Sequence, residues 1–147
     1  MKVVVLEQEN CGELEIEIRC RQMDETVLRV LSYLKQFDKK LVGIQNGETF
    51  ILEPDNIYYC ESVDKRSFLY AQQEVYESPM RLYELEERLS GGSFFRASKS
   101  TVINLARIQA FRSSPLGHGK IEVTMENGEM LYVSRAYVPV LKEKLGM

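Results

Sequence analysis

Apolar residues occur along this chain in short runs separated by polar residues. This pattern predicts short strands and few helices. Near the start, Val3 to Leu6 form an apolar run, and apolar residues alternate with charged ones from Leu14 to Cys20. Alternation with a period of two is typical of a half-buried strand. The sequence therefore predicts two strands here, paired as a hairpin around Asn10 to Gly12.

A helix is predicted to follow this hairpin. Asp24 is a residue type that caps helix N-termini. Apolar residues then recur at helical spacing: Val27, Val30, Leu31, Leu34 and Phe37. Residues 1–40 thus read as a ββα extension whose apolar stripe needs cover, from the rest of the chain or from a second copy. We expect the second copy, which makes the extension a dimerisation element.

After Lys39 and Lys40 the pattern changes to short strands separated by turn residues. Asn46 and Gly47 lie between two apolar runs, 41–44 and 49–52, and favour a type I′ hairpin turn because both positions tolerate positive φ. Further strands are expected at 56–62, 67–71, 74–77, 94–95, 108–111, 120–125 and 129–133. Helices are expected from a Ser78 cap to Gly91 and from about Arg135 to Leu145, and an exposed loop at 113–119. The pattern predicts a mainly β domain over residues 41–147.

The charge of the chain is unevenly spread. The formal net charge of −3 over 147 residues argues weakly against nucleic-acid binding, but distribution matters more than the sum. No acidic residue lies between Glu87 and Glu122, whereas basic residues there are Arg88, Arg96, Lys99, Arg107, Arg112 and Lys120. This segment is a local positive field that can meet phosphates.

Other features exclude several classes of protein. Three scattered cysteines fit reduced thiols, and no apolar run suits a signal peptide or membrane span, so we expect a cytoplasmic protein without membrane insertion. His118 is the single histidine, and motifs for phosphate cofactors or zinc proteases are missing. A Cys60–His118 nucleophile pair stays open, but no third group orients it. We expect no enzyme activity, no cofactor and no metal.

The run from Phe94 to Asn104 carries more specific information. It is followed by Ile108, by Asn127–Gly128 and by Val133–Ser134–Arg135, and preceded by the expected strand Ile57–Glu61 and helix Leu82–Leu89. This ordered series resembles the LytTR DNA-binding family over about residues 41–147. Ser98 departs from the pattern, because the family usually has His there, and whether this changes specificity stays open.

The resemblance implies an elongated stack of small antiparallel β-sheets. It also implies a transcription regulator that reads major grooves of double-stranded DNA with loops between strands. Carried over by position, the contacts come from three loops: Lys65, Arg66 and Ser67; Ser98, Lys99 and Ser100; Ser134 and Arg135. Lys and Arg neutralise phosphates and read guanine, and Ser hydroxyls reach phosphate oxygens. Arg96 joins the second loop as a candidate contact.

Alternatives stay open for several of these residues. Lys65 and Arg66 also suit a polar hairpin turn, and Arg96 suits a structural salt bridge or backbone contact. Asn104 is expected to bond the backbone at a turn rather than read a base.

For the whole chain, the runner-up is a protein-interaction module on a LytTR-like scaffold. We expect a homodimer on promoter sites with two half-sites. Proteins of this short type are similar to those that act with a small membrane protein, and the length leaves no room for a receiver domain.

Overall fold

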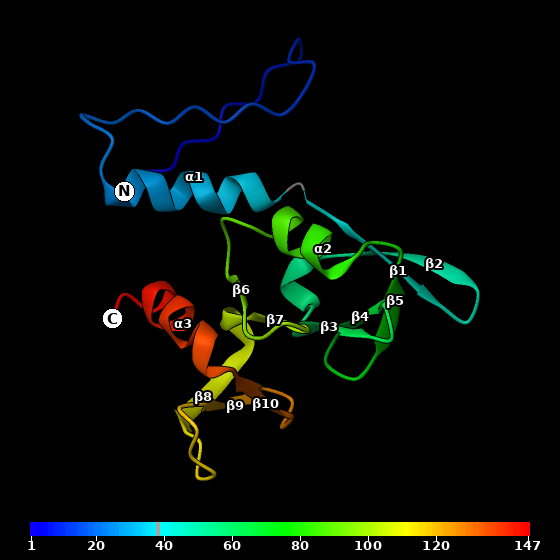
Figure 1. Ribbon diagram of the computed structural model, residues 1–147. Coiled ribbons are helices and arrows are strands. Elements are labelled where there is room, and N and C mark those ends of the chain that lie inside the picture. Colours follow the sequence, from blue (N-terminus) through cyan, green and yellow to red (C-terminus); the bar gives the residue numbers. More distant parts are fainter. Residues whose placement is uncertain (38) are drawn as a thin grey trace.

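The computed structural model describes residues 1–37 and 39–147 apart from the side chains of Gln36 and Phe37. Within this part of the chain, the strands form two antiparallel sheets (Figure 1). The seven-stranded sheet has the order β2-β1-β5-β4-β3-β7-β6 and the three-stranded sheet the order β10-β9-β8. The strands are β1 (Leu41–Gln45), β2 (Glu48–Leu52), β3 (Tyr59–Val63), β4 (Arg66–Tyr70), β5 (Val75–Ser78), β6 (Phe94–Arg96), β7 (Thr101–Asn104), β8 (Ile108–Ser113), β9 (Ile121–Met125) and β10 (Met130–Val133). The helices are α1 (Glu25–Phe37), α2 (Leu82–Arg88) and α3 (Val138–Lys144), with short 3₁₀ turns η1 (Pro54–Asn56), η2 (Leu105–Arg107) and η3 (Arg135–Tyr137). The mainly β class expected from the sequence is confirmed.

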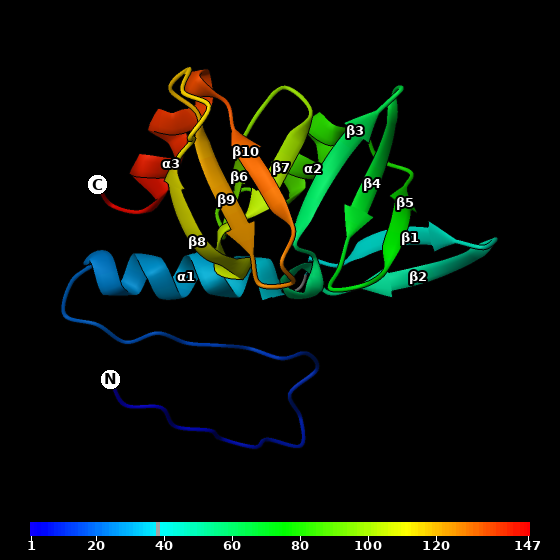
Figure 2. The same cartoon turned by 90° about the horizontal axis from the view of Figure 1, so that it is seen from below.

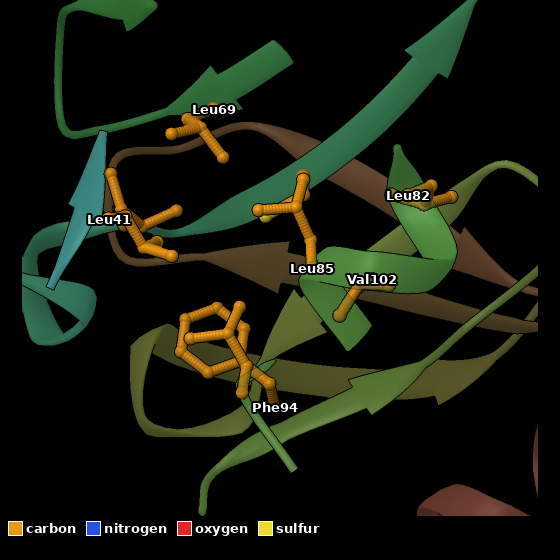
Figure 3. Close-up of a cluster of buried hydrophobic side chains, with 9 residues drawn as sticks. Leu41, Leu69, Leu82, Leu85, Phe94 and Val102 are labelled. Atoms are coloured by element: carbon orange, nitrogen blue, oxygen red, sulfur yellow. The ribbon is translucent and has the colours of Figure 1, made fainter. Parts of the chain in front are cut away.

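Alternation within the central strands explains why the large sheet is covered on both faces. Neighbouring residues point to opposite faces of a sheet, so Phe94 and Val102 join the apolar cluster beneath α2, whereas Phe95 and Ile103 join a second cluster. Figure 3 shows the first cluster, in which Leu85 of α2 is fully buried. The second cluster contains side chains from the three-stranded sheet and α3, such as Val123, Val133 and Leu141. The large sheet is thus the middle layer between α2 and the smaller sheet.

Two hairpin turns follow the predicted chemistry. Asn46 and Gly47 join β1 to β2 with φ values of 52° and 78°. Asp64 and Lys65 join β3 to β4 with φ values of 51° and 67°. Positive φ at both central residues is the requirement of a type I′ turn, and its twist matches the flanking strands. The expected polar turn at residues 63–66 is therefore confirmed.

The second helix begins later than the sequence predicts. Ser78 ends strand β5, and its Oγ accepts a hydrogen bond from the backbone N–H of Met80 at 3.1 Å instead of capping a helix. The N-cap is Arg81, whose backbone N–H donates to Oε1 of Glu84 at 3.0 Å. Ser78 is drawn into the sheet because it pairs with Ser67 of β4.

One strand was not foreseen by the sequence pattern. Residues 101–104, part of the family-like run, form β7, which lies between β3 and β6 in the large sheet. Val102, Ile103 and Asn104 are all buried, so the period-two alternation that marks a half-exposed strand is missing. Strands covered on both faces lack this signal.

The two strands expected before α1 are not formed. Residues 1–24 contain no strand, and most of their apolar side chains are exposed, with Leu14 81% and Ile16 60% accessible, whereas Ile18 is half-buried. A two-stranded hairpin without a covering layer is marginal in water. The predicted helix does form: the backbone N–H of Val27 donates to Oδ1 of Asp24 at 3.0 Å. Val27, Val30, Leu31 and Leu34 are half-buried, and Phe37 lies outside the described side chains.

Among the residues that the structure describes, no helix is long and apolar enough to cross a membrane.

Candidate nucleic-acid interface

The loops that carry the predicted contacts lie along one edge of the molecule. Figure 2 shows the β3–β4 turn, the β6–β7 loop and the β8–β9 loop on one side of the sheets, together with the start of η3. Helix α1 and the N-terminal segment lie on the opposite side. The three loops expected to act together are therefore gathered on one surface, which we call the loop edge (residues 64–66, 97–100, 114–120 and 134–135).

Backbone hydrogen bonds hold neighbouring parts of the loop edge in place. The N–H of Ser62, beside the first turn, donates to the carbonyl oxygen of Ser100 at 2.8 Å. The N–H of Ser134 donates to the carbonyl oxygen of Ala97, also at 2.8 Å. The β6–β7 loop is thus tied on one side to the large sheet and on the other to the segment after β10. Such links fix the spacing between the loops.

Of the three contacts predicted in the first turn, Lys65 is the exposed one without an ion pair among the described residues. Lys65 is exposed at the tip. Arg66 makes two hydrogen bonds to Glu77, from Nε at 2.8 Å and from Nη2 at 2.7 Å, and this guanidinium lowers the pKa of the Glu77 carboxyl. Ser67 is 4% exposed between β3 and β5, so its hydroxyl does not reach the surface.

The side chain of Arg96 binds the backbone of the second loop and holds it in place. Its Nε donates to the carbonyl oxygen of Ser98 at 2.6 Å, and its Nη2 donates to that of Lys99 at 2.5 Å. Its Nη1 pairs with Oε1 of Glu86 on α2 at 3.2 Å. The side chain is 19% exposed. The sequence left two interpretations of Arg96, a DNA contact or a structural salt bridge or backbone contact. The geometry is that of the structural contacts.

The outer residues of the second loop present polar groups to solvent. The Oγ of Ser98 accepts from the backbone N–H of Ser100 at 3.2 Å, which closes a small turn. The Lys99 side chain is exposed at the tip of this turn, and Ser100 is exposed beside it. Because Arg96 binds the carbonyl oxygen of Lys99, the backbone at Lys99 is held in place while the Lys99 side chain is exposed.

Arg135 connects the third loop with one that sequence reasoning left out of the site. Arg135 is exposed, and a Cβ atom at Gly119 would lie 3.1 Å from its Cγ and Cδ. The side chain therefore lies along the β8–β9 loop, whose His118 and Lys120 are also exposed. The available signal was the glycine-rich loop inside an acid-free segment, but no motif placed it beside Arg135.

Asn104 has the structural role expected for it. It is fully buried at the end of β7. Its Nδ2 donates to the carbonyl oxygen of Ile57 at 2.9 Å, and its Oδ1 accepts from the N–H of Ala106 at 3.0 Å and from the hydroxyl of Ser93 at 2.6 Å. These bonds join three segments that carry the loop edge, and no base could reach the amide.

Comparison with known proteins agrees with this arrangement. The family model described as the LytTr DNA-binding domain matches residues 47–146, more than half of the chain. The chain belongs to the LytTr DNA-binding domain family. A solved LytTr DNA-binding domain, from a methyl-accepting/DNA response regulator of Bacillus cereus, superposes with a TM-score of 0.68 at 24% identity, covering 75% of this chain and 99% of that one. This second likeness concerns the fold.

Some relatives of this LytTr protein match it over its whole length. An uncharacterized HTH-type transcriptional regulator of Staphylococcus aureus (strain NCTC 8325 / PS 47) is 27% identical over 149 residues, which cover 100% of this chain and 99% of the relative. The sensory transduction protein LytT of Enterococcus faecalis (strain ATCC 700802 / V583) is 29% identical over 98 residues, 67% of this chain and 40% of that protein. Together with the family, these relatives support a DNA-binding regulator with a non-enzymatic role.

Proposed function

We propose that this LytTr protein is a sequence-specific transcription regulator that reads successive major grooves of double-stranded DNA with the loop edge. The observation that carries the proposal is the separation of basic side chains into two groups. Arg66, Arg96, Arg107 and Arg112 are ion-paired. Among the described residues, Lys65, Lys99 and Arg135 are exposed on the loop edge and take part in none of the seven ion pairs. Unpaired cations on one edge are available to phosphates and to guanine.

The remaining predicted contacts take different roles in this proposal. Ser100 and Ser134 supply hydroxyls beside the unpaired cations. Arg96 and Ser98 hold the second loop, and Arg66 holds the first turn through Glu77. Ser67 is left out because it is buried. Lys120 joins the contact set because its exposed side chain lies in the loop that meets Arg135.

The staphylococcal relatives are named HTH-type regulators, but the order of elements in this chain favours DNA contact through loops. No two α-helices follow each other along the described chain, since α1 precedes β1 and α2 precedes β6. A helix-turn-helix needs two helices joined by a short turn. This order of elements supports contact through loops between strands.

The proposed active form is a homodimer on a promoter site with two half-sites, joined through residues 1–40. The exposed apolar side chains within residues 1–24 support this proposed dimer. A closed twofold dimer is the commonest soluble homo-oligomer, and it would cover this apolar surface. Two linked readers gain affinity from effective concentration without a new base contact.

The decisive experiment selects bound sequences from random duplexes and then measures affinity by fluorescence anisotropy. Lys99→Ala and Arg135→Ala are each expected to weaken specific binding by about 1 to 3 kcal/mol with an unchanged urea unfolding curve. Lys142→Ala is the matched control, because it removes one exposed lysine from α3, outside the loop edge. Wild-type affinity in both Lys99 and Arg135 variants would refute the contact assignment.

The salt dependence separates this function from a protein-interaction module on the same scaffold. For a dimer on its full site, the log–log slope is expected to correspond to roughly 6 to 10 released counterions. A flat response in the same assay would favour the protein-interaction function, because an apolar contact surface is little affected by salt.

A further inference from the structure

The segment before α1 has the sequence of a strand and lacks a partner strand in the single chain. Leu14, Ile16, Ile18 and Cys20 alternate with Glu13, Glu15, Glu17, Arg19 and Arg21. The segment has an extended trace that runs back toward the start of α1 (Figure 1), and residues 1–24 contain no strand. Nε of Arg19 lies 3.5 Å from Oε1 of Glu17, so two residues separated by one position share a side. Local pattern and observed pairing disagree here, and such disagreement often marks a functional segment.

We infer that residues 13–21 pair with the same residues of a second copy as antiparallel β-strands about a twofold axis. The inference deepens the proposed homodimer and is independent of the proposed DNA contacts. It names the interface as a two-stranded ribbon, which we call the dimer ribbon (residues 13–21 of both copies).

Charge complementarity selects the second copy as the occupant. The acidic residues Glu13, Glu15 and Glu17 occupy the first half of the segment, and Arg19 and Arg21 occupy the second half. Antiparallel pairing of two copies places each acidic half opposite a basic half, and opposite charges across a strand pair are favourable. Parallel pairing in register would place like charges opposite each other, which is unfavourable.

The register with the twofold axis at Glu17 pairs all nine residues of the dimer ribbon with one another. A shift of two residues, with the axis at Ile18, also places Glu opposite Arg but leaves Glu13 and Leu14 without partners inside the ribbon. With the twofold axis at Glu17, Glu13 faces Arg21 of the second copy and Glu15 faces Arg19. The same register places Leu14 opposite Cys20 and Ile16 opposite Ile18, so apolar residues meet apolar residues. A shift of one residue would place charged residues opposite apolar ones. Glu17 then faces the second copy's Glu17, a like-charge pair that is unfavourable but exposed to water, and the four Glu–Arg pairs of the ribbon outweigh it.

The adjoining helix supplies the surface that such a ribbon needs. A lone two-stranded ribbon is marginal in water, so its apolar face must be covered. Helix α1 begins at Glu25, four positions after Arg21, and carries exposed apolar side chains at Leu28 and Tyr33, which are 53% and 72% accessible. The extension is also part of the whole-length match to the staphylococcal relative, which covers 100% of this chain.

Charge variants test the ribbon in the full chain by sedimentation velocity at micromolar concentration. An acidic variant (Arg19→Glu with Arg21→Glu) and a basic variant (Glu13→Arg with Glu15→Arg) are each expected to dimerise at least about tenfold more weakly than wild type. Mixing the two restores a dimer. A swapped variant with all four changes keeps the wild-type net charge and dimerises like wild type. All these side chains are exposed, so urea unfolding of the monomer is unchanged.

Disulfide trapping tests the register. The test uses a background of Cys11→Ser and Cys20→Ser. In it, the cysteine of Glu17→Cys faces the same cysteine of the second copy across the twofold axis, at a Cα separation of about 4.5 to 5.5 Å that a disulfide can span. Mild oxidation is therefore expected to cross-link it. Glu15→Cys is the control, because it faces Arg19 and links only to an Arg19→Cys partner.

Three results would overturn the inference: a monomeric wild-type chain, acidic and basic variants that dimerise like wild type, or efficient self-linkage of Glu15→Cys. Pairing of the segment within its own chain would give the second result. Binding to a single half-site, measured by anisotropy, reports on the loop edge alone. A wild-type chain that is monomeric but still binds a half-site would therefore overturn the ribbon and leave the proposed DNA contacts standing.

Discussion

Replacing Asn104 by alanine tests whether a buried amide, and not a DNA contact, accounts for the asparagine at the end of the family-like run. The change removes three hydrogen bonds: one given to Ile57, and two accepted from Ala106 and Ser93. It removes no side chain from the loop edge, because Asn104 is fully buried.

The expected cost follows from what each partner loses. Ile57 is fully buried, so its carbonyl oxygen is left without a partner, at about 1 to 3 kcal/mol. Ala106 is exposed and Ser93 is half-buried, so water replaces much of the loss, at about 0.5 to 1 kcal/mol each. The sum is about 2 to 5 kcal/mol before a small cavity term, a large part of the stability of a domain of this size.

Urea unfolding followed by far-ultraviolet circular dichroism measures the effect, since the chain has no tryptophan. Asn127→Ala is the matched control. Asn127 also makes two such bonds, to Gln72 and Glu129 at 3.1 Å each, but it lies at an exposed turn, and about 1 kcal/mol or less is expected. Equal losses of unfolding free energy in the two variants would refute the reasoning.

Further predictions concern cysteine chemistry and one glycine. Burial raises the pKa of Cys60 to about 12, so a thiol reagent at pH 8 is expected to modify Cys11 and Cys20 in the native monomer and Cys60 only after unfolding. Because this folded-state pKa lies above the unfolded value of about 8.5, the stabilisation is complete below about pH 8 and declines as pH rises. Cys60→Ala should therefore lose about 1 to 2 kcal/mol less than wild type between pH 8 and 10. Rapid native modification of all three thiols, or parallel pH profiles, would contradict this. A Cβ at Gly43 would lie 2.7 Å from side-chain carbons on both neighbouring strands, so Gly43→Ala should cost about 1 to 3 kcal/mol in thermal or urea unfolding. Gly12→Ala, with nothing within 4 Å, should be neutral and serves as the control.

The sequence alone determined the mainly β class and much of the local structure of the domain. The Asn46–Gly47 turn was predictable because few residues other than Asn and Gly adopt positive φ without cost. The second turn, at Asp64 and Lys65, was marked by a polar break between two apolar runs. Local chemistry was sufficient in both places because a hairpin turn depends on the residues within it.

Features that depend on cover from distant residues were less predictable. Strand β7 is buried on both faces and lost the alternation that marks a strand. The segment before α1 has that alternation and forms no strand in the single chain. Alternation shows that one face of a strand would be apolar, but it does not show whether another part of the chain covers that face. Whether Ser78 capped a helix or ended a strand depended on its pairing with Ser67, eleven positions earlier.

For the candidate site, the sequence supplied the loops and the tertiary structure decided which of their side chains are free. Arg96 and Lys99 looked alike along the chain, since both are basic residues of one motif. Only the folded structure directs Arg96 inward, to the carbonyl oxygens of its own loop and to Glu86, and leaves Lys99 exposed. It also lays Arg135 along the loop that contains Gly119. The physical reason is that a charge becomes structural or available according to which partners the fold brings within hydrogen-bonding distance, and those partners come from elements far apart in sequence.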